Sequence, residues 1–179
     1  MFKKNKIFIL IMSIVILMTS FNFSVSALEV QKIYGTLYIS EWSLYDGGGH
    51  IDWKDDGSIY IDNFVDGVEN WESYEARTGV LREDKWNTVC DLVVSDYNET
   101  SNVNAYCSSD GKIKFNKYNM KNYRYLVQSA IATHEIGHAL GLDDNDNDGS
   151  IMYRYTPLMS EPGSIDLCAY DYAYDYHTY

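Results

Sequence analysis

The sequence predicts an α+β fold in a single domain, and three observations support it. Several short runs alternate apolar and polar residues, which is typical of strands. Two longer stretches carry apolar residues three or four positions apart, which is typical of amphipathic helices. The predicted order is strand, helix, several strands, long helix, irregular loop, helix, and runs of strands followed by helices favour an α+β layout over a βαβ repeat.

The first 27 residues have the composition of a secretory signal peptide. Three lysines precede a mainly apolar run, Ile7–Leu17, and the small residues Val25-Ser26-Ala27 follow. The apolar run is shorter than the roughly 20 residues that a membrane-spanning helix needs, which makes a membrane anchor the less favoured alternative. We therefore expect cleavage after Ala27, secretion, and a mature domain of residues 28–179 that is a soluble monomer.

The mature chain is strongly acidic. It keeps 11 Lys and Arg against 26 Asp and Glu, a net charge of −15, because the first 27 residues contain three lysines and no acidic residue. This charge argues against nucleic acid or an anionic membrane as the partner. It is compatible with basic substrates, and more simply with solubility and calcium affinity.

Three cysteines remain after the predicted cleavage, so one disulfide and one thiol are expected in an oxidising compartment. Cys90 and Cys107 flank a short polar loop between strand-like runs and form the preferred pair, while both pairings with Cys168 stay open. The absence of a CxxC spacing in the sequence argues against a Cys/His zinc site.

The first half of the mature chain predicts a strand, a loop and a helix. Residues Leu28–Ser40 alternate apolar and polar side chains, and residues 46–57, DGGGHIDWKDDG, have the composition of a surface loop. A helix is expected from Ile61, where apolar residues recur at helical spacing. These residues are Ile61, Phe64, Val65, Val68 and Trp71.

The second half predicts three strands and two helices. The strands are expected at residues 88–95, 102–107 and 112–116. A long helix capped by Asn119 or Asn122 follows, and a last helix begins at Ser164.

The segment HEIGHALGLDDNDNDGSIM, residues 134–152, predicts a catalytic zinc site. His134 and His138 lie four residues apart on the long helix, so their imidazoles project about 5–6 Å apart from one face and can bind one ion. Glu135 can reach water in an open coordination position without being a ligand. A solvated helix that carries this pattern by chance is the alternative interpretation.

Asp144 is the favoured third ligand. Gly141 is expected to end the helix in a left-handed turn, which returns the chain toward the metal. Asp144 follows ten residues after His134, where a third ligand would come round. The rivals for this position are Asp143, His50 and His177.

These residues resemble the metzincin metalloproteases. His134-Glu-Ile-Gly-His138-Ala-Leu-Gly141-Leu-Asp-Asp144 is similar to their extended zinc signature, and Ser150-Ile-Met152 to their Met-turn. The aspartate in the third position resembles the small secreted snapalysin-type enzymes, whereas SIMY and the strand GKIKFN are more similar to the matrixins. Outside residues 134–152 the resemblance is one of pattern.

The resemblance implies a fold and an activity. The fold is a twisted, mostly parallel sheet with one antiparallel edge strand, a long helix, a zinc-binding helix, a Met-turn and a C-terminal helix. The activity is hydrolysis of protein or peptide substrates by zinc-activated water, with Glu135 as general base and Met152 packed beneath the metal. Substrate would lie along the edge strand, for which Asn102–Cys107 is the candidate.

The sequence departs from metzincin patterns at two points. It contains no cysteine-switch segment, so latency through a thiolate on zinc is not indicated. Tyrosines stand one and three residues after Met152, at Tyr153 and Tyr155, which does not match the tyrosine of astacin-like members.

The aspartate run also resembles a calcium loop. Residues 144–151, DNDNDGSI, match the first eight positions of an EF-hand loop, but the twelfth position is Tyr155 instead of a bidentate glutamate. Three interpretations stay open. Asp144 binds zinc while Asp146 and Asp148 form a solvated turn or a weak calcium site; Asp143 binds zinc and Asp144 begins a calcium site; or the acidic run only shapes the loop.

Two other classes of function compete with a peptidase. One is a metzincin-like binding module without turnover, which the intact Glu135 argues against. The other is a calcium-dependent adhesion domain, motivated by the aspartate loop and the 17 tyrosines.

Overall fold

The computed structural model of the chain describes residues 36–86 and 89–179. The chain divides into two compact units, residues 1–37 and 38–179, and the fold below is that of the second. The predicted signal peptide and residues 28–35 of the first predicted strand lie outside the described residues. No helix in the described part of the chain has the length and apolar character needed to cross a membrane.

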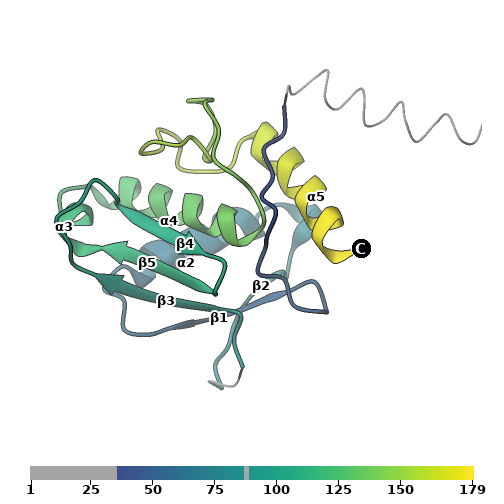
Figure 1. The fold of residues 1–179 in the computed structure, drawn as a ribbon, viewed down its shortest axis with the longest axis horizontal. Coiled ribbons are helices and arrows are strands. Elements are labelled where there is room, and N and C mark those ends of the chain that lie inside the picture. Colours follow the sequence, from purple (N-terminus) through teal and green to yellow (C-terminus); the bar gives the residue numbers. More distant parts are fainter. Residues whose placement is uncertain (1–35, 87–88) are drawn as a thin grey trace, which may run out of the picture. The chain divides into compact units, whose positions relative to one another are not determined.

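A mixed sheet forms one layer of the second unit (Figure 1). Its strands are β1 (Ile51–Asp55), β2 (Leu81–Glu83), β3 (Leu92–Tyr97), β4 (Ala105–Ser108) and β5 (Lys112–Asn116). The spatial order is β2-β1-β3-β5-β4, and every neighbouring pair is parallel except β4 with β5. β4 is therefore the antiparallel edge strand that the metzincin resemblance implies.

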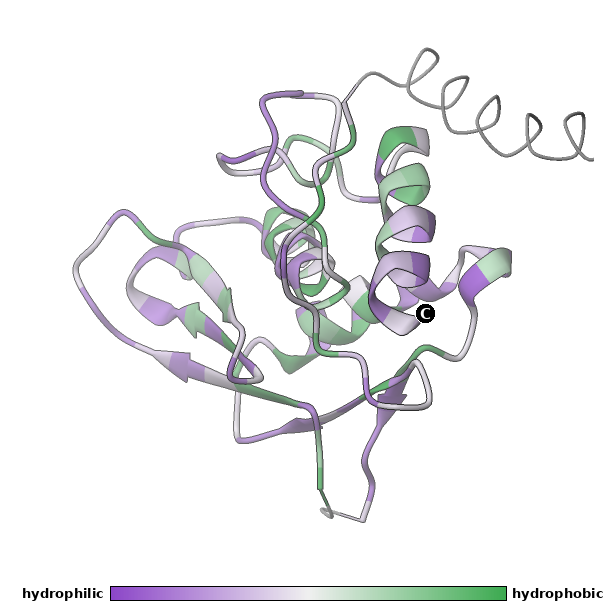
Figure 2. Cartoon of the chain, turned by 45° about the vertical axis from the view of Figure 1, so that its right-hand side comes forward, coloured by the Kyte–Doolittle hydropathy of each residue, from purple (hydrophilic) through white to green (hydrophobic). Residues whose placement is uncertain are grey.

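The helices are α2 (Ile61–Glu72), η1 (Glu75–Arg77), α3 (Lys117–Met120), α4 (Tyr125–Ala139) and α5 (Ser164–Thr178). α2 packs on α4, and α4 lies beside β4 (Figure 1). Gly67 allows the close approach of α2 to α4, because a Cβ there would lie 3.0 Å from the Thr133 backbone nitrogen. α4 lies near the centre of Figure 2, where many residues have the green colour of hydrophobic side chains. Its residues 129–137 are all buried. The fold is α+β, as predicted.

Several predicted elements are confirmed. α2 begins at Ile61, β5 spans Lys112–Asn116, and α5 begins at Ser164. Two predicted strands are displaced along the chain. β3 spans Leu92–Tyr97 instead of residues 88–95, and β4 begins at Ala105 instead of at residue 102.

The surface loop predicted for residues 46–57 is wrong over its second half, which forms β1. Ile51 and Trp53 are 0% and 6% exposed, and β1 pairs with both β2 and β3. The alternation of Ile51 and Trp53 with polar neighbours has the period of a strand, but glycines and aspartates surround it. Burial between two strands outweighs the loop-forming composition.

Two other local predictions are corrected. Residues 36–40 contain no strand, and Ile39 forms an isolated antiparallel bridge with Leu142. The N-cap of α4 is Arg124, which makes no side-chain cap. The amide of Asn119 instead donates to the carbonyls of Ser101 and Val103, and that of Asn122 to the carbonyl of Tyr118.

The preferred disulfide is absent. Cys90 and Cys107 are both free thiols, and none of the three cysteines, all of which the structure describes, forms a disulfide. The sheet order supplies the reason, since β5 lies between β3 and β4. Two strand spacings separate positions by about 10 Å, beyond the roughly 7 Å between Cα atoms that a disulfide can bridge.

Candidate metal centre

The buried helix α4 fixes the two histidines and the glutamate of the predicted zinc motif. His134 and Glu135 are 8% and 6% exposed, and His138 lies one turn farther on. Trp71 of α2 holds α4 next to His134, because its indole nitrogen donates to the Thr133 carbonyl at 2.8 Å.

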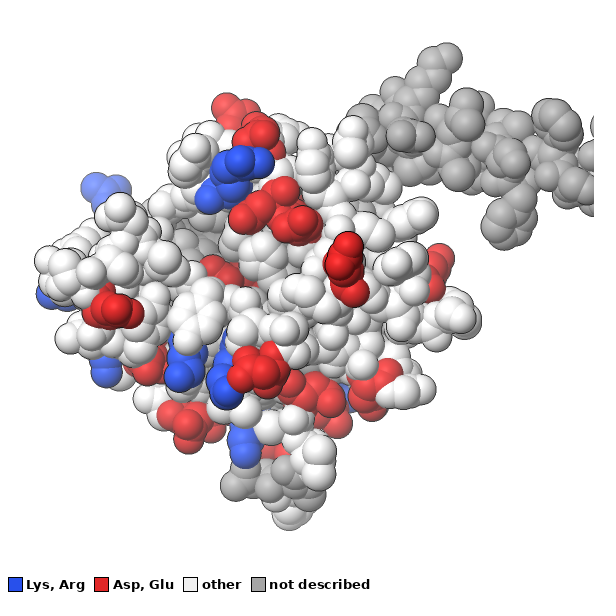
Figure 3. Space-filling model, in the orientation of Figure 1, with Lys and Arg blue, Asp and Glu red and all other residues white. Residues whose placement is uncertain are grey.

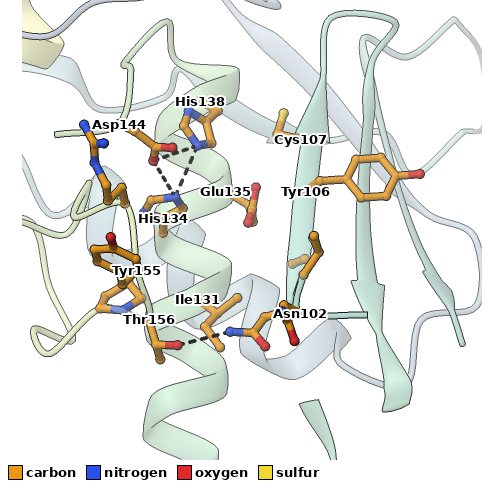
Figure 4. Close-up of a pocket in the computed structure, with 15 residues that line it drawn as sticks. Asn102, Tyr106, Cys107, Ile131, His134, Glu135, His138, Asp144, Tyr155 and Thr156 are labelled. Atoms are coloured by element: carbon orange, nitrogen blue, oxygen red, sulfur yellow. Dashed lines mark hydrogen bonds and ion pairs between the residues drawn. The ribbon is translucent and has the colours of Figure 1, made fainter. Parts of the chain in front are cut away.

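Backbone carbonyls determine which imidazole nitrogen carries the proton. His134 Nδ1 lies 2.8 Å from the Ile151 carbonyl, and His138 Nδ1 lies 3.0 Å from the Leu142 carbonyl. A carbonyl oxygen only accepts, so each Nδ1 must donate. In neutral imidazoles both Nε2 atoms then present lone pairs, and these two atoms lie 3.2 Å apart (Figure 4).

Asp144 completes the group from the loop after α4. Gly141 ends the helix with φ of 87°, the left-handed conformation that the sequence predicts. The chain then returns, and Asp144 Oδ1 lies 3.3 Å from His134 Nε2 and 3.6 Å from His138 Nε2. This oxygen is buried and accepts no hydrogen bond.

The three atoms fit the donor set of tetrahedral zinc. Ligand atoms 2.0–2.1 Å from such an ion lie about 3.3–3.4 Å from one another. The separations of 3.2, 3.3 and 3.6 Å match this value. When both imidazoles are neutral, these three lone-pair atoms face one another and would repel without a cation, so the chemistry of the group also fits a metal.

Side-chain hydrogen bonds hold the loop that carries Asp144. Ser150 Oγ accepts from Asn145 Nδ2 at 2.8 Å and from the Met152 backbone nitrogen at 3.0 Å. The same hydroxyl donates to the buried carboxylate of Asp166 on α5, which also accepts from the Ile151 backbone nitrogen at 3.1 Å. The loop is therefore tied to α5 next to the three candidate ligands.

Met152 packs directly under the zinc motif. It is 1% exposed, and a Cβ added to Gly137 would lie 2.3 Å from its sulfur. The glycine between Glu135 and His138 thus makes room for the methionine.

Glu135 points into a cleft beside the three candidate ligands (Figure 4). Burial raises the pKa of its carboxyl, while His134, His138 and the backbone N–H of Cys107 act in the opposite direction. The cleft has a volume of about 450 Å³. Its floor is α4, one wall is β4 with the residues before it, and the other wall is residues 154–157.

A comparison with protein families decides the relationship. Residues 62–173 match the family model of the matrixin peptidases. The chain belongs to the matrixin family. A comparison with curated proteins finds no match.

Matrixins are zinc metallopeptidases, and the matched residues of this matrixin run from α2 to α5. The predicted metzincin relationship is therefore confirmed. The match covers all the residues of the candidate metal centre and both walls of the cleft.

The other predicted ligands lie apart from the centre of this matrixin. His50 is paired with Asp46 at 3.6 Å, and His177 packs beside Gly141. Asp143 Oδ1 accepts the backbone N–H of Asp144 at 2.8 Å, so it faces its own loop. None of these three residues belongs to the group that His134 forms.

Asp146 and Asp148 of the predicted calcium loop are exposed and do not lie in a cluster of possible ligands among the described residues. Asp146 pairs with Arg154 Nε at 2.7 Å, and neither Asp146 nor Asp148 belongs to a potential metal-binding group within the described ranges. A calcium site there stays a prediction. The second acidic group that the structure does gather, Asp46, Asp52 and Asp91, was not predicted from sequence.

Acidic side chains are spread over the face shown in Figure 3, as the net charge of the chain leads one to expect. Few positive residues line the cleft, and Arg154 is the cation at its rim. Sequence reasoning missed the contributions of Arg154 and Thr156 to the cleft walls, whereas Asn104 lies within the predicted edge segment Asn102–Cys107. The proximity of Arg154 and Thr156 in sequence to Met152 was the available signal.

Proposed function

We propose that the chain is a secreted zinc endopeptidase whose metal is held by His134, His138 and Asp144. The observation that carries the proposal is the convergence of three lone-pair atoms, 3.2–3.6 Å apart, beside a buried carboxylate in an open cleft. The family supports the metal and the class of reaction.

Glu135 is proposed as the general base. Bound zinc would act as a Lewis acid that makes water more acidic and polarises the scissile carbonyl. Burial raises the pKa of Glu135, so its carboxylate takes up a proton more readily than an exposed one. It lies beside the metal-binding group, where it would accept the proton of the attacking water and deliver it to the leaving amine.

β4 is proposed to hold the substrate. It pairs with β5 on one side and is the last strand of the sheet, while Ala105, Tyr106 and Cys107 line the cleft. An extended peptide can add to such an edge through main-chain hydrogen bonds. This arrangement would draw a substrate strand across the metal-binding group.

The proposal includes the processing predicted from sequence. Residues 1–27 would be removed as a signal peptide, and residues 28–179 would be the active form outside the cell. The composition of the N-terminal residues supports this part.

The test compares mature wild-type protein with Glu135→Gln on casein and on fluorogenic peptides. Glu135→Gln keeps the shape of the side chain and removes the base, so hydrolysis should fall about 10²–10⁴-fold while zinc content stays at wild-type level. Glu75→Gln is the matched control, because Glu75 is an exposed residue of η1 outside the cleft, and this variant should hydrolyse like wild type.

A chelator should abolish wild-type hydrolysis, and added zinc should restore it. Undiminished hydrolysis by Glu135→Gln would refute the assigned base, and full activity in the chelator would refute the metal.

A further inference from the structure

One end of the cleft is closed by a hydrogen bond between its two walls. Asn104 Nδ2, just before β4, donates to Thr156 Oγ1 on the opposite wall at 3.1 Å (Figure 4). The two residues are 52 positions apart in the sequence. Thr156 lies beside Ile131 of the cleft floor in Figure 4, and Asn104 and Thr156 both line the cleft.

This closure lies near the metal-binding group. Ile131 stands three residues before His134 on α4, which is about 4.5 Å along the helix axis. The bonded pair therefore crosses the cleft near the metal-binding group, where a large substrate side chain that enters on this side would meet it.

The strand-side wall is held in place independently of the bond. The Asn104 carbonyl accepts the backbone N–H of Asn116 at 2.8 Å. Asn116 is fully buried, and its own amide donates to the Val103 carbonyl at 3.0 Å. The Asn104 side-chain oxygen also faces the Tyr123 hydroxyl at 3.5 Å. Asn104 is thus presented to the cleft by a network that does not involve the opposite wall.

The opposite wall is fixed as well. The backbone N–H of Arg154 donates to the Asn145 carbonyl at 3.0 Å, which joins this wall to the Asp144 loop. Pro157, directly after Thr156, is buried. Because both walls are anchored, the hydrogen bond connects two fixed surfaces instead of two mobile chains.

We propose that the Asn104–Thr156 pair closes a specificity pocket, so that the enzyme prefers a small side chain, such as Ala, Ser or Val, at one of the two positions flanking the scissile bond. A Leu or Phe side chain would have to displace the bond. It would then leave an amide and a hydroxyl unpaired against apolar atoms, which is unfavourable. A pocket that differs by a few methylenes discriminates by about 10–200-fold.

The inference rests on the proposed function, and peptide hydrolysis tests it. A peptide library whose cleavage products are identified by mass spectrometry reads both flanking positions. Matched fluorogenic peptides with Ala, Leu or Phe at the selective position then give kcat/KM. Wild type should favour Ala over Leu and Phe by at least about tenfold at one position.

Three variants separate the hydrogen bond from other features of the pocket. Asn104→Ala removes one partner, and Thr156→Val removes the hydroxyl while keeping the size. Both should raise the Leu/Ala ratio of kcat/KM about tenfold. Thr156→Ser keeps the hydroxyl and should keep the wild-type ratio. Circular dichroism melts check that each variant is folded. If only one of Asn104→Ala and Thr156→Val folds, that variant suffices for the test.

The failures are distinguishable. If wild type hydrolyses no peptide with zinc present, the proposed function is wrong and this inference is lost with it. If wild type cleaves with equal preference for Ala and Leu at both positions, or if Asn104→Ala and Thr156→Val keep the wild-type ratio, the proposed function stands and the closed pocket is refuted.

Discussion

The two sides of the proposed metal centre are held in place by different means. On α4, the backbone period places His134 and His138 one turn apart, inside a stretch of buried residues from 129 to 137. On the loop side, Asp144 follows a left-handed glycine and is held by side-chain hydrogen bonds around Ser150. A site built in this way should lose stability when its helix side is damaged, and metal affinity when its loop side is damaged.

The largest effect is expected on the helix side, from Trp71→Ala. Trp71 is fully buried, donates to the Thr133 carbonyl and packs edge-on against Tyr170, with the ring centroids 5.4 Å apart. Truncation of such a residue destabilises by about 3–5 kcal/mol. Chemical denaturation measures the free energy of unfolding. A loss below about 1 kcal/mol would show that α4 does not depend on α2 for its rigidity.

The junction between the two sides should give the next largest effect. Gly141 has φ of 87°, and a Cβ there would lie 2.7 Å from the His177 ring. Gly141→Ala should therefore lose about 1–2 kcal/mol from backbone strain and about 1–3 kcal/mol from the clash. Gly57→Ala is the matched control, because Gly57 has φ of 80° and open space around its Cβ position. Equal losses of unfolding free energy in the two variants would contradict the tight packing of α5 on the helix stop.

A smaller loss of stability, with a specific loss of metal, is expected from Ser150→Ala. It leaves buried partners in the Asp144 loop unpaired, which costs about 1–3 kcal/mol, and it should weaken zinc binding about 10–100-fold. Ser129→Ala is the matched control on the helix side. Ser129 is also buried, with hydrogen bonds to Asp66 and Asn63.

Competition with a zinc-chelating dye gives both affinities. Ser129→Ala should lower the unfolding free energy by a similar amount and leave the zinc affinity within about threefold of wild type. Equal zinc affinities for Ser150→Ala and Ser129→Ala would contradict the comparison. They would show that side-chain hydrogen bonds position the loop ligand no more than they position the helix ligands.

The same difference explains what could be predicted from sequence. His134, Glu135 and His138 follow from helical spacing, and the return of the chain to Asp144 follows from Gly141, since both depend on local backbone geometry. Asp166 carries no local signal, because its contact with Ser150 joins residues 16 positions apart in a buried network.

The fold shows the same division. α2 and α5 were predicted because their periodicity or start signals are local. β1 was missed because two buried residues, Ile51 and Trp53, sit in a glycine- and aspartate-rich segment whose burial depends on β2 and β3. The predicted Cys90–Cys107 disulfide was wrong because the strand order places β5 between β3 and β4. This order cannot be predicted from the residues next to each cysteine.

The most direct test of the central claim is the zinc content of purified mature protein, measured by mass spectrometry for wild type, Asp144→Ala and Asp143→Ala. Asp143 is the adjacent carboxylate, exposed and turned toward its own loop, which makes it a matched control. The proposed ligand set predicts about one zinc ion per chain in wild type and in Asp143→Ala, and a large loss in Asp144→Ala. Full zinc occupancy in Asp144→Ala, or loss of zinc only in Asp143→Ala, would contradict it.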